Sequence, residues 1–162
     1  MENLLRKVYE SRNLSLALRI VSHASAALSV PVFMLLCYRA FTVSLPSLIK
    51  LLVILGAPFL LVTLLRRVIN APRPYEMYAF FEKTPKNKSG SSFPSRHAFS
   101  IFAIGSAALF VYPIIGSALL LLGVCLCVCR VLLGIHFVRD VLAGALIGAL
   151  ASIAGIFIAS PF

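Results

Sequence analysis

The sequence predicts an all-α integral membrane protein, built as a bundle of about five transmembrane helices with an additional N-terminal interfacial helix. Hydrophobic residues make up 60% of the 162 residues and charged residues only 12%, whereas soluble domains carry about 25% charged residues. The mean hydropathy is +1.00. Several apolar runs also approach or exceed the roughly 20 residues that a helix needs to cross about 30 Å of hydrocarbon. We therefore expect one membrane-embedded domain over residues 1–162.

The stretch before the first apolar run, residues 1–13, has the composition of a helix that lies in the membrane interface. It combines basic with apolar side chains, namely Arg6, Lys7 and Arg12 with Leu4, Leu5, Val8 and Tyr9. Such a mixture favours the boundary between headgroups and acyl chains. A cleaved signal peptide is not expected, because Arg19 and His23 interrupt the apolar core that such a signal requires.

Five apolar runs are the predicted crossings. In chain order they are Leu16–Phe41, Leu48–Ile69, His97–Tyr112, Ile114–Leu133 and Val138–Ser160. The third run is the shortest, so we expect its helix to begin at the Ser95 turn and to close at Tyr112-Pro113. Alternating crossings then bring the connections before and after this hairpin to one side of the membrane.

The four cysteines lie inside apolar runs, where a free thiol usually behaves as a small hydrophobic side chain. They are Cys37, Cys125, Cys127 and Cys129. Cys125 and Cys129 share a helix face, but no histidine or further cysteine nearby completes a zinc set. We expect no metal or redox role for them.

Positive charge is concentrated in three short segments at the ends of these runs. The chain carries 15 Lys and Arg against five Asp and Glu, a net charge of +10. The segments are residues 66–74, 93–97 and 129–140. A basic cluster at a membrane surface is often only attracted to anionic lipid headgroups. Arg73, held between two prolines, and Arg130, near a helix end where a charge needs a partner, instead suggest phosphate binding.

The middle segment adds a second kind of anion site. Pro94-Ser95 precedes a helical run, so the free backbone amides of a helix N-terminus are available to a phosphate. His97 falls in the first helical turn, where it could donate a proton to a leaving oxygen. A lone histidine at the interface is more often only a solvated side chain.

The third segment contains the most reactive pair in the chain. Asp140, the only aspartate, follows His136 by four residues, so the two share one helix face. A carboxylate there can engage one ring nitrogen and leave the other free as a nucleophile. Arg130 joins them only if the helix breaks, and Gly134 supplies the break. The row His136, Asp140, Gly144, Gly148 and Ser152 is then predicted to face the bundle interior.

These three segments resemble the three signature motifs of the type-2 phosphatidate phosphatase superfamily of membrane lipid phosphatases. The family pattern is Lys, six residues, Arg-Pro; then Pro-Ser-Gly-His; then Ser-Arg, five residues, His, three residues, Asp. Here it reads Arg66, six residues, Arg73-Pro74; then Pro94-Ser95-Arg96-His97; then Cys129-Arg130, five residues, His136, three residues, Asp140. Three motifs in order and with intact spacing are a far more specific signal than any one of them alone.

The resemblance implies a role for each matching residue. His136 would form a phosphohistidine, Asp140 would orient it, and His97 would protonate the leaving oxygen. The phosphoryl group would be held by Arg66, Arg73, Ser95, Arg96 and Arg130. Arg66 replaces the family's Lys and keeps its charge, Arg96 replaces Gly and adds a second phosphate contact, and Cys129 replaces Ser and removes a hydroxyl.

We expect this chemistry to need no metal ion and no cofactor. Metal-dependent phosphatases hold their ions with several clustered carboxylates. The carboxylates of this chain are instead scattered along it, as Asp140, Glu2, Glu10, Glu76 and Glu82. The expected partners are a lipid phosphate or diphosphate and the surrounding membrane lipids, with no nucleic acid.

The substrate favoured by the resemblance is undecaprenyl diphosphate, the bacterial cell-wall carrier lipid, because small members of the family resemble phosphatases of that lipid. Phosphatidate or phosphatidylglycerophosphate is the alternative, since the motifs fix the reaction and not the tail. A non-catalytic lipid-binding or transport protein is the alternative of another class. The aromatic and apolar segment 75–81 is expected to be a membrane anchor in preference to a lid.

Two indications oppose each other on the side of the membrane that carries the site. The basic residues outside the motifs favour the cytoplasm under the positive-inside rule. They are Arg6, Lys7, Arg12, Arg19, Arg67, Lys83, Lys86, Lys88 and Arg139. The family resemblance favours the outer face, where a carrier diphosphate is left after its sugar is used. We expect a multi-pass protein of the cell (inner) membrane with its active site on the extracytoplasmic face.

Overall fold

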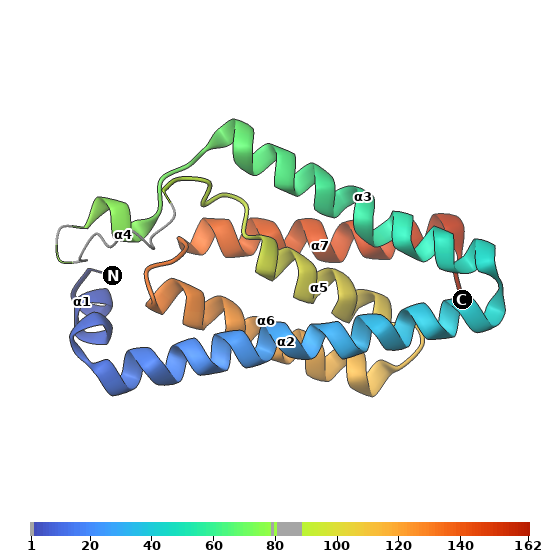
Figure 1. Ribbon diagram of the computed structural model, residues 1–162, viewed down its shortest axis with the longest axis horizontal. Helices are drawn as coiled ribbons and strands as arrows, with labels where there is room; N and C mark the ends of the chain where they lie inside the picture. Colours follow the sequence, from blue (N-terminus) through green and yellow to red (C-terminus); the bar gives the residue numbers. More distant parts are fainter. Residues whose placement is uncertain (1, 79, 81–88) are drawn as a thin grey trace.

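The protein is a bundle of helices, which confirms the predicted fold class. The computed structural model describes residues 2–78, 80 and 89–162. Within these residues the chain forms seven helices and no strand (Figure 1). They are α1 (Glu2–Glu10), α2 (Arg12–Val43), α3 (Leu45–Ile69), α4 (Pro74–Met77), α5 (Arg96–Leu109), α6 (Pro113–Leu132) and α7 (Val138–Ala159).

Four of the expected five crossings are long and apolar enough to span a bilayer. They are Arg12–Val43, Leu45–Met77, which joins α3 to the short α4, Pro113–Leu132 and Val138–Ala159. The third expected crossing is shorter than its apolar run. Helix α5 has 14 residues, which gives a length of about 21 Å against about 30 Å of hydrocarbon. Large apolar side chains cover the outward faces of the long helices, so the chain is a multi-pass membrane protein.

Helix α5 occupies the centre of the bundle. It packs against α7, α6, α2 and α3, and α2 and α3 diverge on either side of it from their turn at Ser44 (Figure 1). A short helix can be tolerated at the centre because its neighbours, and not lipid, surround it. Its apolar sequence therefore reflects burial in protein.

The α5–α7 contact depends on two glycines of the predicted inward-facing row. A Cβ atom at Gly144 would lie 2.3 Å from the Ser95 carbonyl oxygen, and one at Gly148 would lie 2.3 Å from that of Phe99. Both distances are far below van der Waals contact, so only glycine lets the two backbones approach this closely. Gly144 and Gly148 are buried, as are the other members of the row.

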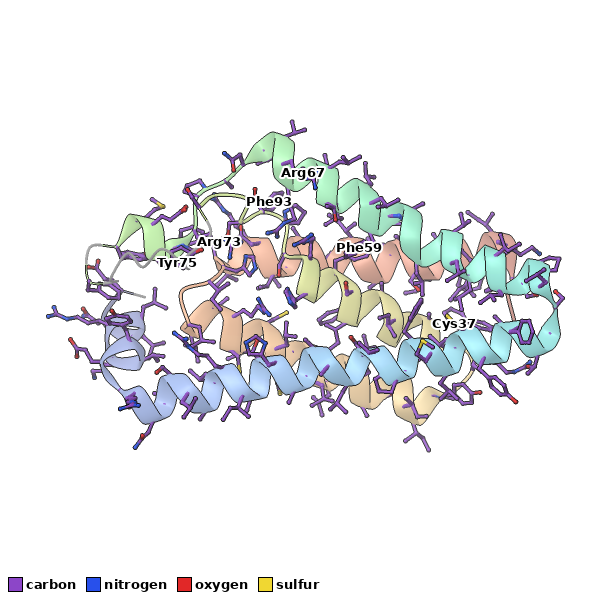
Figure 2. All side chains as sticks on the ribbon, viewed as in Figure 1. Cys37, Phe59, Arg67, Arg73, Tyr75 and Phe93 are labelled. Atoms are coloured by element: carbon purple, nitrogen blue, oxygen red, sulfur yellow. The ribbon has the colours of Figure 1, made fainter. Side chains whose placement is uncertain are left out.

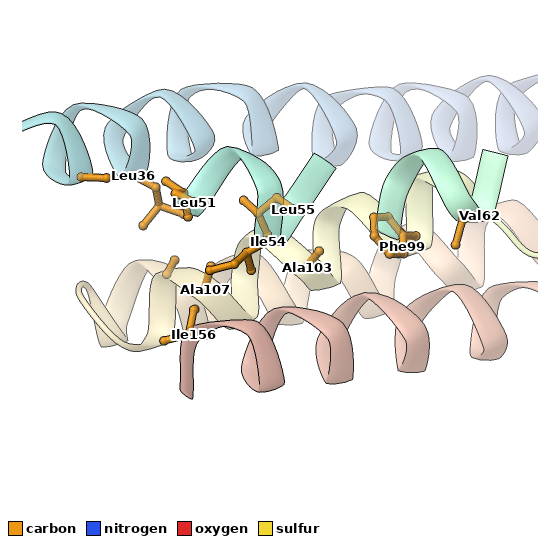
Figure 3. Close-up of a cluster of buried hydrophobic side chains, with 11 residues drawn as sticks. Leu36, Leu51, Ile54, Leu55, Val62, Phe99, Ala103, Ala107 and Ile156 are labelled. Atoms are coloured by element: carbon orange, nitrogen blue, oxygen red, sulfur yellow. The ribbon is translucent and has the colours of Figure 1, made fainter. Parts of the chain in front are cut away.

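The main apolar cluster joins α2, α3, α5 and α7 (Figure 3). It extends from Leu36 and Leu51 near the α2–α3 turn to Phe99 in the first turn of α5. Lipid tails are as apolar as these side chains, so close van der Waals packing holds the cluster together more than exclusion of water does. It fixes the position of α5 from one end of the bundle to the other.

The predicted N-terminal helix is present as α1. Leu5 and Val8 are buried, where α1 contacts α2 and α6. The exposed face carries an ion pair between Arg6 Nε and Glu10 Oε1 at 2.9 Å. Helix α1 lies at the end of the bundle where α3 and α6 finish and α5 and α7 begin (Figure 1).

Candidate active site

The three basic segments of the sequence meet at this end of the bundle. Figure 2 shows Arg67, Arg73, Tyr75 and Phe93 together where α3 ends, while Cys37 lies toward the opposite end. The meeting follows from the order of the helices, because α3 and α6 run toward this end and α5 and α7 start from it. Residues 26 to 48 positions apart in the chain come into hydrogen-bond contact here.

Arg66 ties the second motif to the end of α3. It is buried in the last turn, and its Nη1 atom donates to the Ser92 carbonyl at 3.1 Å and also to the Pro94 carbonyl. Asn70 ends α3 in the left-handed conformation, and its Oδ1 accepts from the Ser91 amide at 3.1 Å. The predicted phosphate ligand Arg66 is therefore also a structural clamp on residues 91–94.

Arg73 is held from both sides. Its amide donates to Glu76 Oε2 at 2.8 Å, and its side-chain Nε donates to the Gly90 carbonyl at 3.0 Å. The amide of Gly90 donates to the other oxygen, Glu76 Oε1, at 2.7 Å. Gly90 has φ +64°, and a Cβ there would collide with Asn70 Oδ1 at 2.2 Å. The guanidinium is thus held by the Gly90 carbonyl and lies over the Tyr75 ring, 5.7 Å from its centroid, while the Glu76 carboxylate is occupied by backbone amides.

Ser95 connects the start of α5 to the start of α7. Its amide donates to the Asp140 carbonyl at 2.9 Å, and its own carbonyl accepts from Phe99 at 3.0 Å. The helix begins at Arg96, so the amides of its first turn lack intrahelical acceptors. The Ser95 hydroxyl makes no capping bond, although the residue is fully buried. Donors at this point are free to meet an anion.

The predicted break between Arg130 and His136 is present at Gly134. Gly134 has φ +65°, and the Arg130 carbonyl accepts from the amides of Ile135 and His136 at 3.1 and 3.3 Å. This tight turn reverses the chain between α6 and α7. It brings His136 back beside the end of α6, where the residue is only 2% exposed.

A serine stands between the predicted nucleophile and its carboxylate. His136 Nδ1 lies 3.6 Å from Asp140 Oδ2, which is too long for a hydrogen bond. Ser92 Oγ lies 3.2 Å from that Nδ1 and donates to Asp140 Oδ2. The Phe137 amide also donates to this oxygen, at 2.9 Å. Because the Ser92 hydrogen is directed at Asp140, the His136 Nδ1–H donates to Ser92, and Nε2 carries the lone pair.

Ser92 was missed by the sequence reasoning. It is one of two consecutive serines in a polar loop and has no helical or motif spacing to His136 or Asp140. Full burial is the property that distinguishes it from Ser91. That property depends on contacts with residues 44 and 48 positions away, so local sequence carries no signal of it.

Burial sets the protonation state of His136. Loss of solvent around the ring lowers the pKa of His136, and the nearby Asp140 carboxylate raises it by a smaller amount. The positive charges of Arg73 and Arg130 add to the lowering. The imidazole is therefore neutral around pH 7, which is the form that can act as a nucleophile.

Three predicted site residues carry buried polar atoms that lack a hydrogen-bond partner among the described residues. They are Ser95 Oγ, Arg130 Nε and Asp140 Oδ1. The exposed Arg139 Nε approaches Asp140 Oδ1 at 3.6 Å. An unsatisfied buried donor costs roughly 1–3 kcal/mol, and an anionic ligand would satisfy both Ser95 and Arg130. Arg130 is 6% exposed, so its charge is unusually dependent on such a ligand.

A polar cavity of about 220 Å³ opens at the same end of the bundle, beside Arg66, Arg73 and Arg96, while Ser95, Arg130 and His136 are not part of its lining. Its wall comes from the end of α3, the loop before α5 and the first residue of α5. The lining residues are Thr63, Arg66, Arg67, Arg73, Ser89, Gly90, Ser91 and Arg96. Four guanidinium groups around so small a volume make it suitable for phosphate oxygens. We call it the head cavity.

Two further cavities continue between α2 and α3. The middle cavity, about 510 Å³, is lined by Arg96 and His97 together with residues of α2 and with Phe59 and Ser100. The tail cavity, about 250 Å³, shares Phe59 and Ser100 with it and is otherwise lined by apolar side chains and Gly56. His97, the predicted acid, is exposed to the middle cavity, yet partial burial of its ring and the charge of Arg130 lower the pKa of His97 to about 3. The ring is therefore neutral near pH 7 until a bound anion offsets the positive charges around it. The three cavities thus lead from charged to apolar surroundings.

Some sequence predictions fall wholly or partly outside the described residues. Of the predicted anchor 75–81, the structure describes residues 75–78 and 80, and α4 ends at Met77. The basic residues Lys83, Lys86 and Lys88 also lie outside the described part. All four cysteines are free thiols within α2 and α6.

Comparison with known proteins places the chain in a family. The sequence profile of the PAP2 superfamily matches residues 47–160. Lipid A 1-phosphatases of Rhizobium etli and Rhizobium johnstonii are each 33% identical, over 93 and 94 residues. These matches cover 55% and 56% of this chain and 40% and 38% of those proteins. The chain therefore spans well under half the length of these relatives.

Two solved structures share the fold. One is the transmembrane PAP2 type phosphatidylglycerolphosphate phosphatase from Bacillus subtilis, with a TM-score of 0.68 and 22% identity, covering 91% of this chain and 77% of that one. The other is Aquifex aeolicus LpxE, with a TM-score of 0.68 and 24% identity, covering 96% and 93%. The resemblance seen in the sequence motifs is confirmed, and the chain belongs to the PAP2 superfamily.

Proposed function

We propose that this protein hydrolyses a phosphate or diphosphate group of a membrane lipid through a phosphohistidine at His136. The observation that carries the proposal is the arrangement around that residue. Its Nδ1 is engaged by Ser92, which is bound to Asp140, so Nε2 is left as the nucleophile. Arg130 and Ser95 supply buried donors that lack partners among the described residues. A phosphoryl group fits both features.

The proposed reaction has two steps. Burial and the charges of Arg130 and Arg96 lower the pKa of His97 to about 3, so in this proposal the ring takes up a proton from solution when the anionic substrate offsets those charges. His136 Nε2 then attacks phosphorus, the bond from phosphorus to the leaving oxygen breaks, and His97 gives that oxygen the proton. Water then attacks the phosphohistidine, His97 takes its proton, and inorganic phosphate is released. Arg66, Arg73 and Arg130 stabilise the charge on the transferring group. Asp140 acts through Ser92 to stabilise the imidazole as it becomes positive.

The head, middle and tail cavities support a lipid substrate. A phosphorylated headgroup fits the arginine-lined head cavity, and a hydrocarbon chain fits the tail cavity, whose wall is almost entirely apolar. Within this class we favour undecaprenyl diphosphate as substrate. Phosphatidate or phosphatidylglycerophosphate is the alternative, and the second of these is the substrate named for the Bacillus subtilis neighbour. A lipid A 1-phosphate is a further candidate, because two relatives act on it.

The test of the mechanism is phosphate release in detergent micelles. We expect His136→Ala to release no phosphate above background, and the native enzyme to keep its rate in excess chelator. The control is His23→Ala, which removes an exposed histidine of α2 and is expected to retain activity. Near-normal hydrolysis by His136→Ala would refute the nucleophile. Loss of activity in chelator that is restored by magnesium would refute the metal-independent mechanism.

The substrate is tested by a panel in one assay. Undecaprenyl diphosphate, phosphatidate, phosphatidylglycerophosphate and lipid A are compared in the same micelles at equal mole fraction. We expect the highest kcat/KM for undecaprenyl diphosphate. A non-catalytic lipid-binding or transport protein would bind these lipids and release phosphate from none of them.

We also propose that the site faces the outside of the cell membrane. Met77, at the end of α4, is 64% exposed at the site end of the bundle and is a suitable position for a probe. The variant Met77→Cys, in a chain with its four natural cysteines replaced, is treated with an impermeant thiol reagent on intact cells. Labelling is expected. Labelling only after the membrane is opened would reverse the assignment.

A further inference from the structure

We infer that Arg96 forms a second anion subsite, which holds the phosphate that a lipid diphosphate keeps after the reaction. The inference rests on the proposed phosphatase activity and makes Arg96 the residue that selects diphosphates over monophosphates. Among the residues that the structure describes, Arg96 alone lines both the head cavity and the middle cavity. It therefore stands between the arginine-lined head cavity and the space that leads to the tail.

The neighbours of Arg96 define the leaving-group side of the site. Arg96 and His97 are the first two residues of α5, and both line the middle cavity. His97 is the residue proposed to protonate the leaving oxygen, so the leaving group must lie in this cavity. Ser29 and Ser100 add hydroxyl groups to its wall. A charged side chain beside the proton donor suits a leaving group that is itself an anion.

The arginines of the head cavity form no ion pair with a carboxylate among the described residues. The ion pairs in that part of the chain involve Arg6, His136 and Arg139 instead. Both Glu76 oxygens accept from backbone amides. Arg66 and Arg73 are also engaged by carbonyl groups, whereas Arg96 has no hydrogen-bond partner among the described residues. An anionic ligand supplies the missing partner.

The chemistry of the two substrate types explains why this partner is a retained phosphate. With a diphosphate, His136 Nε2 attacks the terminal phosphorus and the bond to the bridging oxygen breaks. That oxygen takes the electron pair, receives the proton of His97, and leaves as part of a lipid monophosphate anion. With a monophosphate, the same steps release a neutral alcohol. Only the first leaving group presents phosphate oxygens for the guanidinium of Arg96.

The test compares two probes that differ only in the number of phosphates, farnesyl diphosphate and farnesyl phosphate. The measured quantity is the ratio of their kcat/KM values in the same micelles. We expect the native enzyme to prefer the diphosphate, and Arg96→Gln to lower the ratio at least about tenfold, the effect of losing a charge-assisted hydrogen bond. Arg96→Lys keeps the charge without the planar fork and is expected to recover part of the ratio. Lys50→Gln, an exposed charge change near the far end of α3, is the control and should leave the ratio unchanged.

Each remaining outcome has a defined meaning. If Arg96→Gln lowers both kcat/KM values equally, or neither, Arg96 does not recognise the second phosphate and the inference is wrong while the phosphatase activity stands. A native enzyme that prefers farnesyl phosphate would overturn the inference in the same way. If the native enzyme releases phosphate from neither probe nor from any lipid of the panel, the proposed function fails and the inference fails with it. Thermal melting of each variant excludes unfolding as the cause of a lost rate.

Discussion

Removing the Ser92 hydroxyl is expected to slow turnover without weakening substrate binding. Ser92 Oγ accepts from His136 Nδ1 at 3.2 Å and donates to Asp140 Oδ2. In Ser92→Ala this bridge is lost, and the direct separation of 3.6 Å between the imidazole and the carboxylate is too long to replace it. The imidazole then loses its fixed tautomer and the negative charge that stabilises it as it attacks phosphorus.

The size of the effect follows from the burial of this bridge. Ser92 and Asp140 are fully buried and His136 is 2% exposed, so water does not readily replace the lost hydroxyl. A buried hydrogen bond to a charged group contributes about 1.5–3 kcal/mol. Since each 1.36 kcal/mol is tenfold in rate, kcat should fall by about 10- to 150-fold. The KM should change little, because Ser92 is proposed to touch the imidazole and not the phosphate.

The assay measures kcat and KM for phosphate release in micelles, together with the melting temperature of each variant. Ser106→Ala is the matched control, because Ser106 is also a buried serine of this bundle, at 2% exposure, in the second half of α5. We expect it to keep its kcat. A folded Ser92→Ala enzyme with native kcat would refute the serine bridge. A raised KM at unchanged kcat would move Ser92 from positioning the nucleophile to binding the substrate.

Three more predictions test the surroundings of this bridge. Asp140→Asn keeps the shape but removes the charge, so kcat should fall by about 100-fold or more in a protein that still folds; a fully active, folded variant would make the carboxylate structural. Burial lowers the pKa of His136, so the charged ring forms only in more acidic solution. In a plot of kcat/KM against pH, corrected for substrate ionisation, the loss of activity on the acid side should therefore have an apparent pKa below about 6.5, the ordinary pKa of histidine. An apparent pKa at or above that value contradicts a buried neutral nucleophile. Gly144→Ala places a Cβ 2.3 Å from the Ser95 carbonyl oxygen and should lower the free energy of unfolding by about 1–3 kcal/mol. Gly56→Ala is the control, because a Cβ there has nothing within 4 Å, and it should melt no lower than the native protein. Equal melting temperatures of the two variants would show that α5 and α7 can separate freely.

The sequence alone was enough to infer that the chain lies in a membrane, where its long helices are, and which residues form the motifs. Long apolar runs with few charges are a property of local composition, so the four long helices could be assigned without any knowledge of their packing. The break at Gly134 followed from the geometry of a helix, because six residues turn Arg130 and His136 to different faces. The four-residue spacing of His136 and Asp140 indicated the reactive pair for the same local reason.

The length of α5 was decided by tertiary structure. Its apolar run predicted a membrane crossing that closes in a tight hairpin at Tyr112-Pro113. The hairpin is present, since α6 begins at Pro113, but the helix before it has only 14 residues. An apolar residue looks the same in a sequence whether lipid or a neighbouring helix covers it. Only the packing of α5 against α7, α6, α2 and α3 shows that protein covers it.

The arrangement of the site was likewise decided by contacts between distant parts of the chain. Ser92 reaches residues 44 and 48 positions away, and Arg96 lies between two cavities whose walls come from α2, α3 and the loop before α5. Spacing along one helix cannot predict such contacts, because they depend on how closely separate helices approach. That approach is set by backbone contacts such as those at Gly144 and Gly148. The spacing of the glycines in the sequence indicates which helix face is in contact, but the distance between the helices is known only from the folded structure.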